Sequence, residues 1–134
     1  MAADFGKLLD QIQTNNDQLK ISYGRLGRAY EKLDGRLTRL GARARVEPYA
    51  IDKKSERKIG YRRFEHGWSI TTMVQGVAGL EAEVPVSETS PHVQAELMPH
   101  VAPLLEKISA LIADDVKNAK KAVTEAEKLL AALP

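Results

Sequence analysis

Apolar residues recur at alternating steps of four and three through the first 40 residues of the chain. One row runs every seven residues from Phe5 to Leu40, and a second row lies between its members and contains one polar residue, Asn16. Such a heptad repeat predicts a long helix that packs along a single line against another helix. We call the two rows together the N-terminal seam. Its members are Phe5, Leu9, Ile12, Asn16, Leu19, Tyr23, Leu26, Tyr30, Leu33, Leu37 and Leu40.

The seam predicts one helix over residues 1–42. Gly24, Gly27 and Gly35 lie inside this range, and each costs about 1 kcal/mol relative to Ala in a helix interior. The heptad phase continues unbroken through all three, so we expect the helix to continue as well. Gly41 directly follows the last leucine of the seam and is a typical stop signal.

The partner of the N-terminal seam has two interpretations. A lone polar residue in a heptad seam can fix the register of a parallel dimer, and Asn16 would then pair with its copy in a second chain. Alternatively, the seam packs on the chain's own C-terminal helix, with Asn16 near an end that water reaches. The sequence leaves both open.

A row of cations runs beside the seam on the same predicted helix. Successive members are three or four residues apart, which places them on one helical face. We call this row the basic stripe: Arg25, Arg28, Lys32, Arg36, Arg39 and Arg43. Between residues 25 and 63 the chain has thirteen Lys and Arg against five Asp and Glu, although its net charge is only +2. Together with Arg62 and Arg63, the stripe is a candidate polyanion-binding surface. The alternative is a solvated face, or one paired with acidic residues of the C-terminal helix.

Residues 43–75 predict a three-stranded antiparallel meander. The segments 56–64 and 68–75 are its best strand pair, and His66-Gly67 suits a tight turn between them. With a two-residue turn, Ile59, Tyr61, Trp68 and other apolar residues share one face, so we expect Trp68 to fill the core under the helices.

The C-terminal part of the chain predicts a loop over residues 76–90 and a kinked helix over residues 91–133. Ser90-Pro91 has the pattern of a helix N-cap followed by proline in the first turn. Pro99 predicts a break near residue 98, and the main helix should follow from about residue 102. Its later half again alternates steps of three and four, and we call this set the C-terminal seam: Val116, Ala119, Val123, Ala126, Leu130 and Leu133.

The sequence provides no catalytic motif, and we expect no enzymatic activity, cofactor or metal site. The chain has no cysteine, which excludes thiolate ligands and a cysteine nucleophile. Spacing would place His92, Glu96 and His100 on one helical face, but Pro99 interrupts that stretch, so we read them as surface residues.

These patterns together predict a single α+β domain over residues 1–134, in which two long helices pack in the manner of a coiled coil as an antiparallel or crossing pair. The function that we expect is non-enzymatic: a cytoplasmic interaction or scaffold protein that forms a homo-oligomer, most simply a dimer, through its helical seams. The alternative is a nucleic-acid-binding protein that uses the basic stripe. No apolar stretch approaches the roughly 18 residues that a membrane span needs, so we expect no membrane partner.

Overall fold

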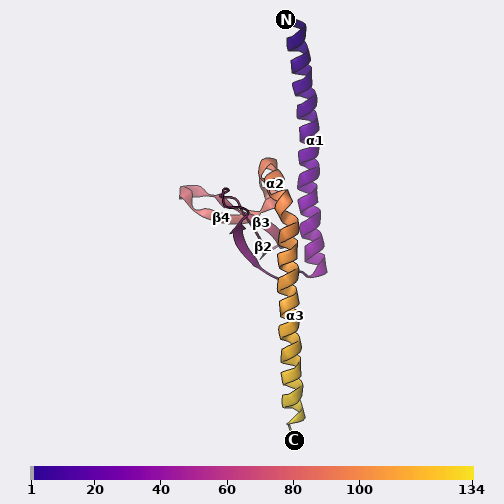
Figure 1. Ribbon diagram of the computed structural model, residues 1–134, viewed down its shortest axis with the longest axis vertical. Coiled ribbons are helices and arrows are strands. Elements are labelled where there is room, and N and C mark those ends of the chain that lie inside the picture. Colours follow the sequence, from indigo (N-terminus) through magenta and orange to yellow (C-terminus); the bar gives the residue numbers. More distant parts are fainter. Residues whose placement is uncertain (1) are drawn as a thin grey trace.

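The computed structural model describes residues 2–134 and has the predicted α+β architecture: a long N-terminal helix, an antiparallel sheet and a long C-terminal helix (Figure 1). The sheet has four strands rather than three, in the order β1-β2-β3-β4. The elements are α1 (Ala2–Leu40), β1 (Val46–Ala50), β2 (Lys58–Phe64), β3 (Gly67–Gln75), the short 3-10 helix η1 (Val77–Gly79), β4 (Glu81–Pro85), η2 (Val86–Glu88), α2 (Pro91–Leu97), η3 (Met98–His100) and α3 (Val101–Ala131).

Helix α1 ends where the sequence predicts. Gly41 has a φ of +73°, a left-handed conformation that side chains disfavour, and its N–H bonds to the carbonyl oxygen of Thr38. The N–H of Ala42 then bonds to the carbonyl oxygen of Leu37, which closes the helix end. The chain turns there and enters the sheet.

The β2–β3 hairpin has the predicted two-residue turn, because Phe64 pairs with Gly67 across Glu65 and His66. The predicted apolar face therefore forms: Ile59, Tyr61 and Ile70 are fully buried on it. Trp68 is only partly buried, and its ring stacks on that of Tyr61 with 5.2 Å between centroids. Tyr61, rather than Trp68, is thus the large ring at the centre of this face.

Strand β4 was not predicted, since residues 76–90 read as a loop. Glu81–Pro85 pairs with β3 from Gln75 back to Thr71, so the hairpin continues for five residues on each strand. The short segment is polar at its start and ends in proline, which weakens its strand signal. Its backbone pairing with β3 stabilises it all the same. The tip of this hairpin projects away from the helices (Figure 1).

The C-terminal helices follow the predicted kink. The Ser90 side chain accepts a hydrogen bond from the Val93 N–H, and Pro91 occupies the first turn of α2. Pro99 lies in η3, where the chain bends into α3. The buried Gln94 side chain donates hydrogen bonds to the carbonyl oxygens of Val86, Ser87 and Thr89, and so holds α2 against the preceding loop.

The two long helices differ from the predicted coiled-coil-like pair. They run in the same direction rather than antiparallel, and they lie side by side only around the middle of the molecule (Figure 1). From this common region, α1 extends beyond the sheet at one end and α3 at the other. The reason is that α1 packs mainly on β3 and α2, and it meets α3 near its own C-terminal end, where Leu37 and Leu40 line a groove with Leu105. The core lies in the middle region, where Tyr30, Leu97 and Leu104 meet the apolar face of the sheet.

Candidate interaction surfaces

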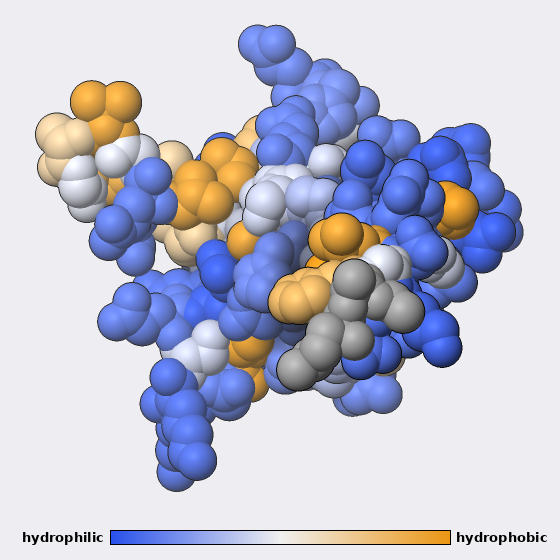
Figure 2. All heavy atoms as spheres, turned by 90° about the horizontal axis from the view of Figure 1, so that it is seen from above, coloured by the Kyte–Doolittle hydropathy of each residue, from blue (hydrophilic) through white to orange (hydrophobic). Residues whose placement is uncertain are grey.

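The first half of α1 lies free of the rest of the molecule. Residues 4–22 are all exposed, and we call this segment the N-terminal arm. Its share of the N-terminal seam is open to solvent: Phe5 is 69% exposed, Leu9 64% and Ile12 63%. Asn16 and Leu19 are exposed as well. Seen from above in Figure 2, apolar side chains lie beside polar ones near this end of the molecule.

The second half of the N-terminal seam packs within the chain. Tyr30 is fully buried and its hydroxyl donates a hydrogen bond of 2.8 Å to the carbonyl oxygen of Gln94. Leu26, Leu33 and Leu37 pack against the core, and Tyr23 lies half-buried at the boundary. At the other end of the seam, Leu40 is exposed. The structure thus divides the seam into a free part and an in-chain part.

The last part of α3, like the first half of α1, does not pack on the rest of the molecule. Residues 113–131 are all exposed, and we call them the C-terminal arm. The arm carries every member of the C-terminal seam except Leu133, and its larger members there are Val116, Val123 and Leu130. Both arms have 19 residues and would each be about 28 Å long at a rise of 1.5 Å per residue. An apolar groove lies between the end of α1 and the first half of α3. Its lining residues are Leu37, Leu40, Gly41, Ala42, Leu105, Ile108, Ser109 and Ile112.

A shallow depression lies in the middle of the C-terminal seam. Four of its lining residues, Val116, Ala119, Lys120 and Val123, have the spacing i, i+3, i+4 and i+7. Ala119 lies among longer side chains and leaves the depression open. Four residues at this spacing form the hole that receives one side chain of a facing helix in coiled coils.

The six cations of the basic stripe are all exposed. Five of them lie on α1, whereas Arg43 lies in the connection to β1, because the helix ends at Leu40 and does not continue to Arg43 as the spacing of the stripe predicted. Within residues 2–134, no member of the stripe takes part in an ion pair. The predicted pairing with acids of the C-terminal helix is therefore not formed, because α3 diverges from α1. Arg62 is engaged elsewhere: its guanidinium lies 3.7 Å from the Glu83 carboxylate and over the Phe64 ring, whereas Arg63 is exposed.

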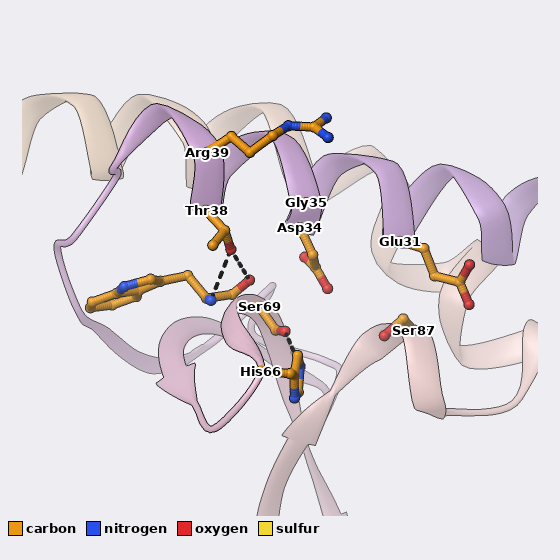
Figure 3. A pocket seen from close by; sticks show the side chains of 9 residues that line it. Glu31, Asp34, Gly35, Thr38, Arg39, His66, Ser69 and Ser87 are labelled. Atoms are coloured by element: carbon orange, nitrogen blue, oxygen red, sulfur yellow. Dashed lines mark hydrogen bonds between the residues drawn. The ribbon is translucent and has the colours of Figure 1, made fainter.

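The junction between α1 and β3 contains the principal buried charge, which sequence reasoning did not find (Figure 3). Strand β4 pairs with β3 only as far as Thr71, so the backbone of β3 from Trp68 to Ile70 lacks a partner strand on that side. Helix α1 supplies the partners. The Asp34 carboxylate accepts the Ile70 N–H at 2.9 Å, and the Thr38 hydroxyl accepts the Trp68 N–H at 2.9 Å and donates to the Trp68 carbonyl at 3.2 Å.

Burial raises the pKa of the Asp34 carboxyl to about 6. Hydrogen bonds from the Ile70 N–H and the Ser69 hydroxyl act in the opposite direction, as does the nearby His66. The net upward shift means that desolvation of the charged form outweighs these contacts. The only advance signal was the i, i+4 spacing of Asp34 and Thr38 on one helical face.

A small pocket beside Asp34 brings together a histidine, a serine and an aspartate. The Nε2 atom of His66 lies 3.3 Å from the Ser69 hydroxyl, and that hydroxyl contacts Asp34. In a hydrolase triad the histidine lies between the other two groups, whereas here the serine does. Ser69 is also fully buried, so its oxygen cannot reach a substrate from solvent. The cluster therefore has the geometry of a structural junction. The pocket is lined by Glu31, Asp34, Gly35, Thr38, Arg39, His66, Trp68, Ser69 and Ser87.

A further exposed apolar group lies at the tip of the β3–β4 hairpin. Val77 is 93% exposed and Leu80 72% exposed, on either side of the turn that contains Ala78 with its φ of +63°. The apolar tip is visible at the left in Figure 2.

Among the described residues, no helix is long and apolar enough to cross a membrane. Searches against protein-family models, curated protein sequences and solved structures found no match to this chain.

Proposed function

We propose that this protein is a non-enzymatic assembly module that associates with copies of itself through its two helical arms. The observation that carries the proposal is the exposure of a heptad seam on each arm, with leucine, isoleucine, valine and phenylalanine side chains facing water. Contiguous exposed apolar surface of this kind is typical of a protein–protein contact. We expect the assembly to act in the cytoplasm.

The energetics of an isolated helix support the same proposal. Most helical stability in proteins comes from packing of an apolar face against other elements rather than from the helix propensity of its residues. The N-terminal arm also contains Gly6, Asn15 and Asn16, which are poor helix formers. A partner helix on the seam would supply the missing stabilisation.

Sedimentation velocity over a series of concentrations tests the proposal. We expect the unmodified chain to associate as its concentration rises, and Ile12→Asp or Val123→Asp to shift it to monomer by placing a charge in the seam. Gln18→Asp, which adds the same charge to an exposed position off the seam, is the matched control. Substitutions at Leu26 or Leu33 are unsuitable because those side chains pack against the core. A monomer at every concentration would refute the proposal.

A second candidate function is the binding of a polyanion such as nucleic acid by the basic stripe. The observation in its favour is that the six cations are exposed and free of ion pairs within the described part of the chain. A row of unpaired cations along a helix can neutralise several phosphates and release their counterions.

Binding of labelled duplex and single-stranded DNA and RNA across a salt series tests this second function. We expect the logarithm of the affinity to fall linearly with the logarithm of salt concentration, with a shallower slope after four stripe cations are replaced by Gln. The matched control removes four exposed lysines elsewhere. Equal loss in both variants, or no binding at low salt, would contradict a role for the stripe. The stripe variant replaces Arg28, Lys32, Arg36 and Arg39, and the control replaces Lys53, Lys54, Lys117 and Lys121.

A further inference from the structure

We infer that the N-terminal arm of one copy pairs, in parallel, with the C-terminal arm of a second copy placed head to tail along the long axis. This inference rests on the proposed function and specifies its geometry. It differs from the pairing of two N-terminal arms through Asn16 that the sequence suggests. Four features of the structure lead to it: the direction in which the seams face, the space beside each arm, the shapes of the two seams, and the number of surfaces covered.

The first feature is the direction of the seams. Leu26, Leu33 and Leu37 pack toward the core, so the same seam on the N-terminal arm faces the open space beyond α2, on the side where α3 lies. Likewise, Leu105 and Ile112 line the groove at the end of α1, so the C-terminal seam faces the open space beyond that end. The N-terminal seam thus faces the place that α3 would occupy if it were extended backwards beyond α2. The C-terminal seam faces the place that α1 would occupy if it were extended beyond Leu40.

The second feature is the space that a partner helix can use. The partner of the N-terminal arm must end near the level of α2, because α2 lies against α1 there: the side chain of Gln94 comes within 3.6 Å of the position of a Cβ on Gly27. A second α1 in parallel at this place would continue straight into α2. The free end of a C-terminal arm from the next copy avoids this clash.

The third feature is the complementary size of the seam residues. The N-terminal arm presents Phe5 and Ile12 where the C-terminal arm presents Ala119 and Ala126, each pair seven residues apart. Placing Phe5 in the depression at Ala119 sets Leu9 level with Val123 and Ile12 level with Ala126, because the steps of four and three coincide. Large residues then face small ones along the contact, which is the arrangement that fills an interface without voids.

The same register accounts for the polar member of the seam. Asn16 falls level with Leu130, close to the end of α3 at Ala131. Water reaches the amide of Asn16 at that end of the contact, so the asparagine needs no copy of itself as a partner.

The fourth feature is that one kind of contact covers both arms. Pairing two N-terminal arms would leave the C-terminal seams exposed, and pairing two C-terminal arms would set alanine against alanine. A head-to-tail contact joins two different surfaces, so it repeats from copy to copy and forms a filament unless a rotation closes a ring. The chain then forms a two-stranded helical rod in which the in-chain contact of α1 with α3 alternates with the contact between copies.

Disulfide cross-linking tests the geometry, and the absence of native cysteine makes every bond interpretable. Residues that face each other in a parallel coiled coil lie within the roughly 4.4–6.8 Å Cα separation that a disulfide requires. We expect a mixture of the Leu9→Cys and Val123→Cys variants to form covalent dimers several-fold more than either variant alone. The double variant should give a ladder of covalent multimers, since each chain carries both ends of the contact. Replacing Val123→Cys by Lys121→Cys, which lies off the seam, is the control.

The outcomes separate the inference from the proposed function. If sedimentation shows association but Leu9→Cys alone cross-links as well as the mixture does, the N-terminal arms pair with each other and the head-to-tail geometry is wrong. If Leu9→Cys instead pairs with Ala126→Cys better than with Val123→Cys, as it would in an antiparallel contact or a shifted register, the inference is again wrong. If the unmodified chain remains monomeric throughout, the proposed function fails together with it.

Discussion

At the scale of single residues, the attachment of α1 to the sheet depends on two side chains that stand in for a strand. Asp34 and Thr38 bind the backbone of β3 where β4 has ended, so the N–H groups of Ile70 and Trp68 are satisfied. Burial removes water from the charged Asp34 carboxylate, and this desolvation raises the pKa of the group. Folding should therefore depend on pH through this group.

Because the pKa of Asp34 is raised from 3.8 to about 6, the folded state binds the proton more tightly than the unfolded state does. Below pH 3.8 both states are protonated and Asp34 contributes no pH dependence. As pH rises from 3.8 to about 6, the unfolded state loses its proton before the folded state does, so this group progressively lowers the free energy of unfolding. The loss is complete at neutral pH, where it amounts to about 3 kcal/mol. Asp34→Asn keeps an oxygen that accepts the Ile70 N–H and removes the charge. We expect it to flatten the stability profile in this window.

Urea unfolding at a series of pH values measures the effect. The control is Asp17→Asn, which removes a charge from the exposed N-terminal arm. A profile for Asp34→Asn parallel to that of the unmodified chain between pH 4 and 6 would show that Asp34 is not the titrating group.

At the scale of elements, local signals in the sequence predict the boundaries of the helices. Gly41 ends α1, Ser90-Pro91 begins α2, and Pro99 separates α2 from α3, each through a conformational preference of that residue or its neighbours. A two-residue turn at His66-Gly67 was predicted on the same grounds, and the turn forms one residue earlier, at Glu65-His66. The strand β4 was missed because its pairing with β3 depends on a distant segment of the chain, and propensity carries little of that information.

Replacing one glycine in the sheet and one in α1 by alanine compares how well each element accommodates an added methyl group. A Cβ on Gly60 would lie 2.9 Å from both the Thr71 hydroxyl and the Val46 carbonyl oxygen, because the irregular β1 strand crosses close to it. We expect Gly60→Ala to lower the free energy of unfolding by at least about 1 kcal/mol through this overlap. Gly35 lies in the interior of α1 with open space around it.

Gly35→Ala should raise the free energy of unfolding by up to about 1 kcal/mol, since alanine is the better helix former. Urea unfolding of both variants at one pH gives the comparison. Equal effects of the two substitutions would mean that β1 moves away from Gly60 without cost.

At the scale of the whole molecule, a central body carries two helical arms that point in opposite directions. The body contains the buried residues, whereas residues 4–22 and 113–131 have no buried side chain. An elongated chain with one compact core should therefore show two levels of local stability.

Amide hydrogen exchange measured at low and high protein concentration tests this division. We expect amides of residues 4–22 to exchange quickly in dilute solution, because the arm is marginally stable alone, and slowly when partner helices cover the seam. The amides of Ile70 and Leu104 in the core should exchange slowly at both concentrations. Arm amides with the same protection at every concentration would argue that the arms gain nothing from association.

The sequence alone determined the elements of this protein except strand β4, and it left their arrangement open. Heptad spacing, glycine and proline positions, and the alternation in residues 56–75 are local patterns, and local conformational preferences are what they report. They predicted the two long helices, the central hairpin and the kink before α3. They also identified the seams and the basic stripe as rows of residues, since a helical row depends only on spacing.

The tertiary structure decided what those rows face. The same heptad seam is buried from Leu26 to Leu37 and exposed from Phe5 to Leu19, although the pattern is uniform along it. The difference arises because α2 and β3 occupy one side of α1 only along its second half, and no local signal records where a distant element comes to lie. For the same reason the buried Asp34, its hydrogen bonds to β3 and the opposite directions of the two arms became visible only when the chain was folded.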